Sequence, residues 1–271
     1  MKGQAFIAIF ALSALIIGCS KPDSGSGGPA NGGATSGTTT PVAALKDLKI
    51  EDIEPGKGEG AKEGDTLAML YRGQLVDGSV FDGNMDGEFK AMPDKDPFSL
   101  NLGMGMVIPG WDKGLIGIKV GGLRKLSIPA SMAYGPQAQA KIPANSDLIF
   151  NVRCLDIVRR GEESVIDIKD TKAGTGAEVK KGDKVTIHYV GKLLNDKEFD
   201  SSRKANKPFS FTVGAGEVVP GFDKGVIGMR KGGVRMLRIP PGAAYGANPA
   251  GAIPPNSVLK FEMELLQING K

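Results

Sequence analysis

Histidine and cysteine are almost missing from this chain of 271 residues. Its single histidine is His188, and its two cysteines are Cys19 and Cys154. A repeated Ser/His/Asp or Cys/His catalytic set and a histidine-based metal site are therefore excluded. We expect no metal and no cofactor, and we place His188 at the surface or at a sheet edge.

A strong charge excess and a nucleotide-binding loop are also missing. The 34 basic and 30 acidic residues are interspersed along the chain, which argues against a nucleic-acid partner. The segments Gly103-Met-Gly105 and Gly214-Ala-Gly216 complete neither GxGxxG nor GxxxxGK[ST]. We interpret these glycines as turn residues.

Residues 1–18 have the pattern of an export signal. Lys2 precedes the apolar run AFIAIFALSALIIG, which is short for a membrane span. The run leads into Ile16-Ile17-Gly18-Cys19 and resembles the lipobox of bacterial lipoproteins, in which the cysteine is lipidated and becomes the new N-terminus. An ordinary signal peptide and an uncleaved anchor are the alternatives.

Residues 19–44 are rich in Gly, Ser, Thr and Pro, which predicts a flexible tether. Lipid and tether together predict a protein of the bacterial cell envelope. It would be anchored in a membrane through Cys19, with the outer membrane favoured and the domains facing the periplasm or the cell surface. A lipidated Cys19 leaves no internal disulfide. Cys154 shares strand parity with Leu148, Phe150 and Val152, which predicts a reduced core cysteine.

The remaining chain contains the same sequence pattern twice. GDTLAMLYRGQL (64–75) matches GDKVTIHYVGKL (182–193) at an offset of 118, and VIPGWDKGLIG (107–117) matches VVPGFDKGVIG (218–228) at an offset of 111. The change in offset marks a seven-residue insertion within GNMDGEFKAMPDKD (83–96). Such a long period indicates duplicated domains. We assign copy one to residues 45–158 and copy two to residues 159–271.

Each copy is predicted to be α+β. Apolar and polar residues alternate in stretches such as 185–193, which predicts antiparallel strands with one buried face. The Pro-Gly-x-Asp-Lys-Gly segment is the exception, because Pro220 and Asp223 suit a helix start and Gly228 suits a stop. The apolar residues at helical spacing in this segment are Phe222, Val226 and Ile227. A single sheet with one short helix on its buried face is expected.

Aromatic motifs recur at matching places in both copies. Core packing accounts for part of them, but Ala-Tyr-Gly lies in a turn-rich segment, where an aromatic residue needs another role. The motifs resemble those of the FK506-binding-protein (FKBP) class of peptidyl-prolyl cis–trans isomerases, over about residues 45–158 and 164–269. They are Gly-Asp…Tyr…Gly, Phe-Asp-Ser-Ser-Arg…Lys-Pro-Phe-x-Phe, Val-x-Pro-Gly-Phe/Trp, Ala-Tyr-Gly and Ile-Pro-Pro-Asn. This resemblance implies two tandem FKBP-like domains, each an antiparallel β-sheet of about five strands wrapped around one short α-helix.

The resemblance also implies a pocket in each copy. Its parts are aromatic side walls with an aspartate, an aliphatic rim with a backbone N–H for the substrate carbonyl, a floor ring on the helix, and an overhanging loop. In copy one these positions are Tyr71, Phe81, Asp82, Phe98, Val107, Ile108, Trp111, Tyr134, Ile142 and Phe150. In copy two they are Tyr189, Phe199, Asp200, Phe209, Val218, Val219, Phe222, Tyr245, Ile253 and Phe261.

The implied activity needs no acid, base or metal. A prolyl amide crosses a barrier of about 18–20 kcal/mol because rotation breaks C–N double-bond character. The planar amide is the more dipolar state, so an apolar pocket favours the twisted state. Lowering the barrier by about 5–6 kcal/mol gives roughly 10⁴-fold acceleration. The implied partners are proline-containing unfolded or partly folded polypeptides and macrolides of the FK506 or rapamycin type.

Two other interpretations of the chain remain open. One or both copies could bind proline segments without turnover, as a chaperone or assembly scaffold in the envelope. A purely structural envelope lipoprotein is the third interpretation, and it leaves the loop tyrosines Tyr134 and Tyr245 unexplained.

Overall fold

The computed structural model describes residues 44–269. The expected signal peptide, the lipidation site Cys19 and nearly all of the expected tether lie outside these residues. Within the described part, no helix has the length and apolar character that crossing a membrane requires.

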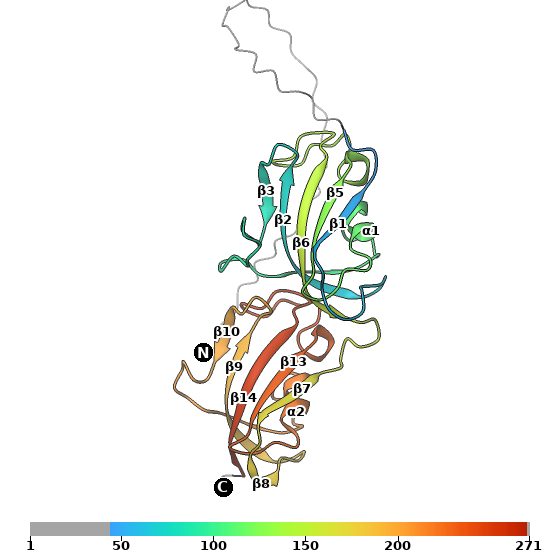
Figure 1. Ribbon diagram of the computed structural model, residues 1–271. Helices are drawn as coiled ribbons and strands as arrows, with labels where there is room; N and C mark the ends of the chain where they lie inside the picture. Colours follow the sequence, from blue (N-terminus) through green and yellow to red (C-terminus); the bar gives the residue numbers. More distant parts are fainter. Residues whose placement is uncertain (1–43, 270–271) are drawn as a thin grey trace, which may run out of the picture. The chain divides into compact units, whose positions relative to one another are not determined.

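Copy one forms a single antiparallel sheet in the order β1-β5-β6-β2-β3 (Figure 1), and β4 also pairs with β2. Strands β3 and β4 pair with different halves of β2, residues 72–74 and 66–69, so they share one position at the side of the sheet. The expectation of about five strands is confirmed in this sense. The strands are β1 (Lys49–Glu54), β2 (Thr66–Leu75), β3 (Val80–Gly83), β4 (Phe98–Asn101), β5 (Leu123–Ile128) and β6 (Leu148–Val158).

Copy two repeats this sheet in the order β10-β9-β14-β13-β7, with β11 paired to β9. Its strands are β7 (Asp167–Lys172), β9 (Lys184–Lys192), β10 (Glu198–Ser201), β11 (Phe209–Thr212), β13 (Val234–Ile239) and β14 (Leu259–Ile268). A separate two-stranded ribbon joins β8 (Thr175–Glu178) to β12 (Arg230–Lys231). The predicted duplication therefore appears as two sheets of the same strand order.

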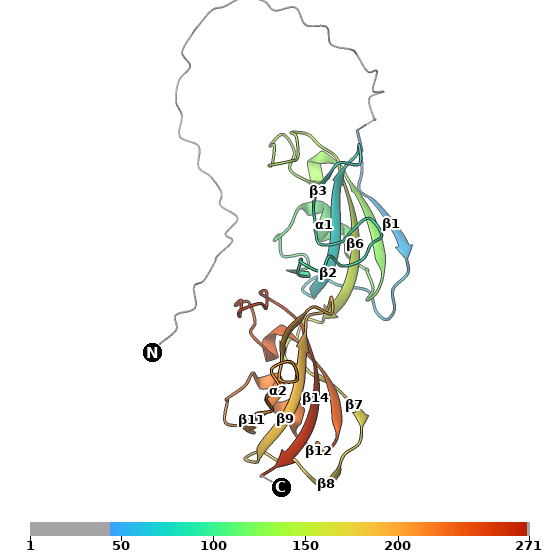
Figure 2. The same ribbon diagram turned by 90° about the vertical axis from the view of Figure 1, so that its left-hand side faces the viewer.

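One short α-helix packs on one face of each sheet, α1 (Pro109–Gly114) in copy one and α2 (Pro220–Val226) in copy two (Figure 2). Proline occupies the first turn of both, as predicted. The expectation that Ile227 continues the helical spacing of Phe222 and Val226 is wrong, because the helix ends at Val226. Ile227 has extended backbone angles, and its side chain is 45% exposed.

The helices approach their sheets closely because glycine follows the first proline. A Cβ atom added to Gly110 would lie 2.4 Å from Cγ2 of Ile128, and one added to Gly221 would lie 2.3 Å from Cγ2 of Ile239. A side chain at either position would therefore push the helix away from the strand beneath it. The repeated Pro-Gly pair sets both the start of the helix and its distance from the sheet.

A buried arginine holds the end of each helix. Arg124 donates hydrogen bonds from Nη1 to the carbonyl oxygens of Gly114 (2.9 Å) and Ile116 (2.8 Å), and its Nε lies 2.6 Å from Asp52 Oδ1. The hydrogen bond from Arg124 lowers the pKa of Asp52. Arg235 of copy two makes the same set of contacts with Gly225, Ile227 and Asp170.

The structure buries Cys154, as predicted, but it does not place His188 at a sheet edge. Cys154 is fully buried, and burial raises the pKa of its thiol to about 12, as suits the predicted reduced core cysteine. His188 lies on β9, which has strands paired along both sides, so the sheet-edge alternative is wrong. Its ring is half-buried, with Nδ1 3.1 Å from Ser202 Oγ.

Candidate active site

Four strands and the helix of copy one bring aromatic rings into one cluster. Trp111 from α1 lies edge-on to Tyr71 from β2, with ring centroids 5.4 Å apart, and to Phe150 from β6 at 5.1 Å. Phe98 from β4 lies 5.9 Å from Trp111, and Phe81 from β3 lies 5.5 Å from Phe150. Edge-to-face packing of this kind stabilises the arrangement beyond simple area burial. Five of the six predicted rings of copy one, all but Tyr134, therefore share one apolar site.

Copy two builds the same cluster with a phenylalanine on the helix. Phe222 from α2 lies 5.7 Å from Tyr189 and 5.0 Å from Phe261, again near perpendicular. Phe199 lies 5.6 Å from Phe261, and Phe209 lies 5.9 Å from Tyr189. Since the helix ring meets the tyrosine and the late phenylalanine at matching spacings in both copies, phenylalanine and tryptophan serve the same position on the helix.

A tyrosine–aspartate hydrogen bond closes one side of each cluster. The hydroxyl of Tyr71 donates to Asp82 Oδ2 at 2.6 Å, and the hydroxyl of Tyr189 donates to Asp200 Oδ2 at 2.5 Å. The second oxygen of each carboxylate accepts the next backbone N–H in the chain, at 2.8 Å. Burial, and then the aspartate, raise the pKa of both tyrosines. Both tyrosines therefore stay neutral donors across the physiological pH range.

The rim residues combine half-buried side chains with free backbone donors. Val107 and Ile108 pack against the core of copy one, as Val218 and Val219 do in copy two. The N–H groups of Ile108 and Val219 donate to no other group within residues 44–269. Each is therefore a candidate donor to an added carbonyl oxygen.

The loop residues divide into buried and exposed ones. Ile142 and Ile253 are buried against their clusters, whereas Tyr134 and Tyr245 are exposed. Burial, and then the charge of Asp82, raise the pKa of Tyr134. Neither loop tyrosine hydroxyl has a hydrogen-bond partner in the described part of the chain, so both can donate to a bound molecule.

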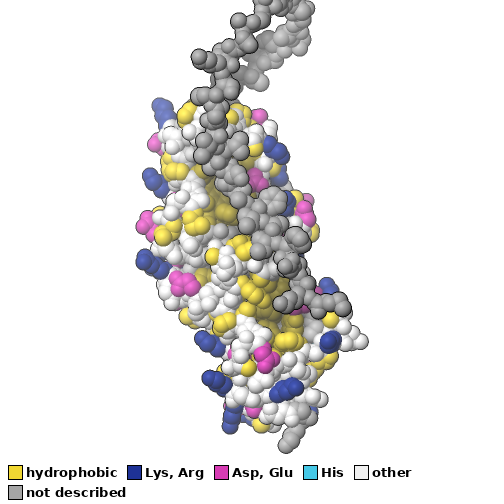
Figure 3. Space-filling model, turned by 180° about the vertical axis from the view of Figure 1, so that it is seen from behind, with side chains coloured by type: hydrophobic (Ala, Val, Ile, Leu, Met, Phe, Trp, Pro, Cys, Tyr) yellow, Lys and Arg dark blue, Asp and Glu magenta, His cyan; other side chains and the backbone are white. Residues whose placement is uncertain are grey.

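The floor rings are more covered than the walls. Trp111 and Phe222 are each 4% exposed, because the surrounding rings meet them edge-on. Exposure concentrates on Phe98 and Phe209 and on the loop tyrosines. Figure 3, viewed from the helix side of both sheets, shows apolar side chains gathered on each copy with charged residues mainly at the margins. Nε1 of Trp111 is buried without a hydrogen-bond partner, a group that copy two lacks.

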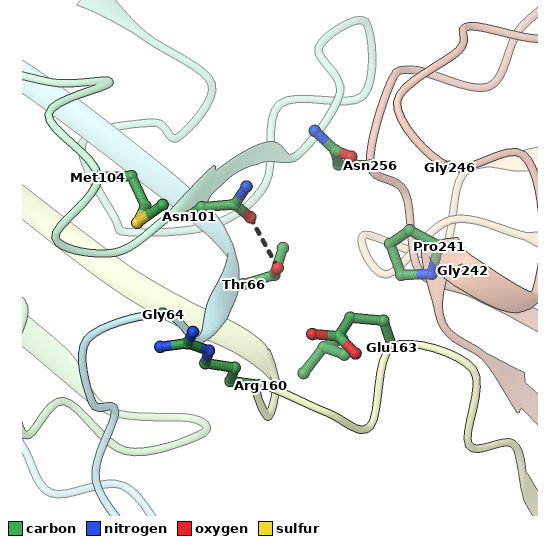
Figure 4. Close-up of a pocket in the computed structure, with 11 residues that line it drawn as sticks. Gly64, Thr66, Asn101, Met104, Arg160, Glu163, Pro241, Gly242, Gly246 and Asn256 are labelled. Carbon is green, nitrogen blue, oxygen red and sulfur yellow. Dashed lines mark hydrogen bonds between the residues drawn. The ribbon is translucent and has the colours of Figure 1, made fainter.

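The hollow drawn in Figure 4 does not coincide with either aromatic cluster. Its volume is about 380 Å³, and no predicted site residue lines it. Thr66 Oγ1 and Asn101 Oδ1 form a hydrogen bond of 2.8 Å within it. Without an aromatic side chain in its lining, it is no candidate for holding a prolyl ring.

Sequence reasoning did not assign a site role to Gly73 and Gly191, although the Tyr-x-Gly pattern repeats. A Cβ atom at Gly73 would lie 2.6 Å from the Phe81 ring and 2.7 Å from the Phe150 ring. At Gly191 it would lie 2.7 Å from Phe199 and 2.8 Å from Phe261. The absence of a side chain at the repeated glycine therefore leaves room for two wall rings.

Gly73→Ala and Gly191→Ala are expected to displace the walls of one copy each. The added methyl group would lie closer to two rings than van der Waals contact allows. Moving these rings costs about 1–3 kcal/mol. We expect the affinity of the altered copy for ligand to fall about tenfold or more. Chemical-shift changes of the wall-ring protons report the displacement, and confinement of those shifts to the altered copy is the control. Unmoved rings in both variants would contradict this role.

The family model described as FKBP-type peptidyl-prolyl cis-trans isomerase matches residues 57–155 and 176–266, which is more than half of the chain. The chain belongs to this family. The resemblance seen in the sequence is therefore confirmed for both copies, and the FKBP-like sheet and helix of each copy agree with it.

Several FKBP proteins are similar to the chain. Human peptidyl-prolyl cis-trans isomerase FKBP9 is 32% identical over 209 residues, covering 77% of this chain and 35% of that protein. FK506-binding protein 4 of Aspergillus fumigatus is 47% identical over 134 residues, covering 48% and 26%. The crystal structure of FkpA from Escherichia coli is 40% identical, covering 38% of this chain and 47% of that one, with a TM-score of 0.36. The chain thus spans about a third of the length of FKBP9.

Proposed function

We propose that this FKBP-family chain is a peptidyl-prolyl cis–trans isomerase with two sites, acting on proline-containing unfolded or partly folded polypeptides. One observation carries the proposal: both copies assemble the same aromatic cluster beside a Tyr–Asp hydrogen bond and a free rim N–H. A core built only for stability has no reason to keep exposed rings at Phe98 and Phe209 in both copies.

In the proposed mechanism, the proline ring lies among the aromatic rings and the preceding carbonyl oxygen accepts from the N–H of Ile108 or Val219. The apolar walls remove water from the amide, which raises the free energy of its dipolar planar state relative to the twisted state. The hydrogen bond holds the carbonyl while the prolyl side rotates. No bond is made or broken, so no proton transfer is needed.

The direct test is exchange NMR on a proline peptide with catalytic amounts of the full chain. We expect the cis–trans exchange rate to rise in proportion to protein concentration, and an FK506-type macrolide to suppress the increase. Binding of the peptide without faster exchange would instead establish a proline-binding chaperone or scaffold.

Trp111 allows binding to copy one to be followed separately, since it is the only tryptophan of the chain. A macrolide or proline peptide that occupies the copy-one cluster is expected to change the tryptophan fluorescence, because it alters the solvation of the indole. Trp111→Phe removes the signal, and Phe222 shows that the helix position accepts phenylalanine. The variant should therefore keep its exchange activity within about threefold. Ligand binding to copy one without any change in emission would contradict the placement of Trp111.

We further propose that the chain is a lipid-anchored protein of the bacterial cell envelope, with the outer membrane favoured. The lipobox-like Ile16-Ile17-Gly18-Cys19 and the polar segment that follows support this proposal. Lipid at Cys19 would keep the protein with the membrane fraction of the expressing bacterium, and Cys19→Ser would release it. Mass spectrometry of the N-terminal peptide tests the lipid itself, and an unmodified Cys19 would overturn the proposal.

A further inference from the structure

The residue immediately before the rim valine differs in chemistry between the two copies. Met106 precedes Val107 in copy one, and Glu217 precedes Val218 in copy two. Both side chains are exposed, Met106 to 60%. Within residues 44–269, Glu217 takes part in no ion pair or side-chain hydrogen bond. An exposed methionine beside a recognition site is a side chain whose apolar surface is free to be covered.

The backbone before these two side chains has similar features in both copies. Each follows a glycine with positive φ, 66° at Gly105 and 73° at Gly216. The loop is fastened to the helix in both copies, because Asp112 accepts the N–H groups of Gly103 and Gly105 at 3.0 Å. Asp223 accepts the N–H of Gly214 at 2.7 Å. The copies therefore share the anchor of the first glycine and differ in side-chain chemistry at this position, although within residues 44–269 only copy one has the second anchoring bond, from Gly105.

A substrate polypeptide must continue past the site on both sides of its proline. Consecutive Cα atoms are about 3.8 Å apart, so a side chain adjoining the rim valine lies within reach of residues that flank the bound proline. Covering a methionine with an apolar flank is favourable at roughly 25 cal/mol per Å². An exposed glutamate attracts Lys or Arg weakly, and salt screens that attraction.

We propose that position 106/217 sets the flank preference of each site: Met106 favours apolar residues beside the proline, and Glu217 favours Lys or Arg. The inference rests on the proposed isomerase function and adds a substrate class to each of its two sites. One chain would thereby process two kinds of unfolded segment, apolar ones at copy one and basic ones at copy two.

Other charges surround both sites. Asp82, Lys113 and their counterparts Asp200 and Lys224 are common to the two copies. Lys141 beside Ile142 has no charged counterpart, since copy two has Ala252, and it disfavours basic flanks at copy one. Lys207, two residues before the wall phenylalanine Phe209, acts against the proposed preference at copy two, whereas Asp96 at the matching place of copy one is paired with Lys197, at 2.7 Å. A test must therefore change position 106/217 while all other charges stay constant.

The experiment uses the full chain with one copy silenced in each parent. Phe199→Ala/Asp200→Ala leaves copy one to act, and Phe81→Ala/Asp82→Ala leaves copy two. Exchange rates are measured for two blocked peptides, one with Lys and one with Leu on both sides of proline. The readout is the Lys-to-Leu ratio of kcat/KM within each parent.

Met106→Glu is expected to raise the ratio about two- to fivefold in the first parent, and Glu217→Met to lower it as much in the second. Glu217→Gln, which keeps the size and removes the charge, should lower the rate for the Lys peptide without raising that for the Leu peptide. Salt of about 1 M should abolish the charge effect. Ratios that stay constant across all three substitutions overturn the inference. If the native chain accelerates neither peptide, the proposed function itself fails.

Discussion

The double variant Phe81→Ala/Phe199→Ala is expected to lose about 30-fold or more of the prolyl exchange activity. Each ring forms a wall of one cluster, packed edge-on against Phe150 or Phe261. Removing it takes away about 2 kcal/mol of apolar contact that the twisted amide would gain, which is about 30-fold in rate. Exchange NMR at fixed protein concentration measures the loss.

The single variants separate the two copies. Phe81→Ala and Phe199→Ala should each leave the activity of the untouched copy, about half of the total if the copies contribute equally. Ile50→Ala/Ile168→Ala is the matched control, because both isoleucines are exposed on the outer strands β1 and β7 and belong to neither cluster. Equal losses in the control and the double variant would show that the walls have no special role.

Arg124→Met is expected to destabilise copy one by about 3 kcal/mol. The substitution leaves the carbonyl oxygens of Gly114 and Ile116 without their donor at the buried end of the helix. Hydrogen exchange of the core amides resolves the copies, so protection should fall in copy one and stay unchanged in copy two. Arg235→Met should lower protection in copy two and leave copy one unchanged. A uniform loss of protection in both copies would contradict the local role of each arginine.

The aspartate partners give this prediction a pH dependence. The pKa of Asp52 is lowered from 3.8, first of all by its hydrogen bond with Arg124. The hydrogen bond with Arg235 lowers the pKa of Asp170 in the same way. The stabilisation is therefore present above the ordinary pKa and is lost as the pH falls through the lowered one. The Arg124→Met variant should lose this acid-sensitive component. Because Asp52 is largely exposed, Asp52→Asn should cost about 1 kcal/mol or less at neutral pH.

Most of the fold could be predicted from the sequence repeat and from its Pro-Gly-x-Asp-Lys-Gly segment. Strict alternation around Tyr189 predicts β9, and Pro220 predicts the start of α2. The helix end was harder to predict, because Ile227 continues the helical spacing of Phe222 and Val226 although the backbone turns at Gly228. Periodicity shows which face of an element is apolar, and a difference of one residue in helix length escapes it.

The site residues came from motif resemblance rather than from periodicity. A two-residue alternation places Tyr71 and Phe150 on an inner face but does not show that Trp111 meets both rings. The role of Gly73 was also hidden, because a missing side chain is informative only once its neighbours are located in space. The free N–H groups of Ile108 and Val219 depend on loop geometry, which local sequence does not determine.

The central claim is that the rings ease rotation of a prolyl amide by removing water from it, without proton transfer. Its most direct test is the pH profile of kcat/KM for an uncharged proline peptide, from about pH 6 to about pH 9, by exchange NMR. With Tyr71 and Tyr189 held neutral across this range, the account predicts a profile flat to within about twofold. A bell-shaped profile with limbs that fall about tenfold per pH unit would show acid–base catalysis and contradict the account.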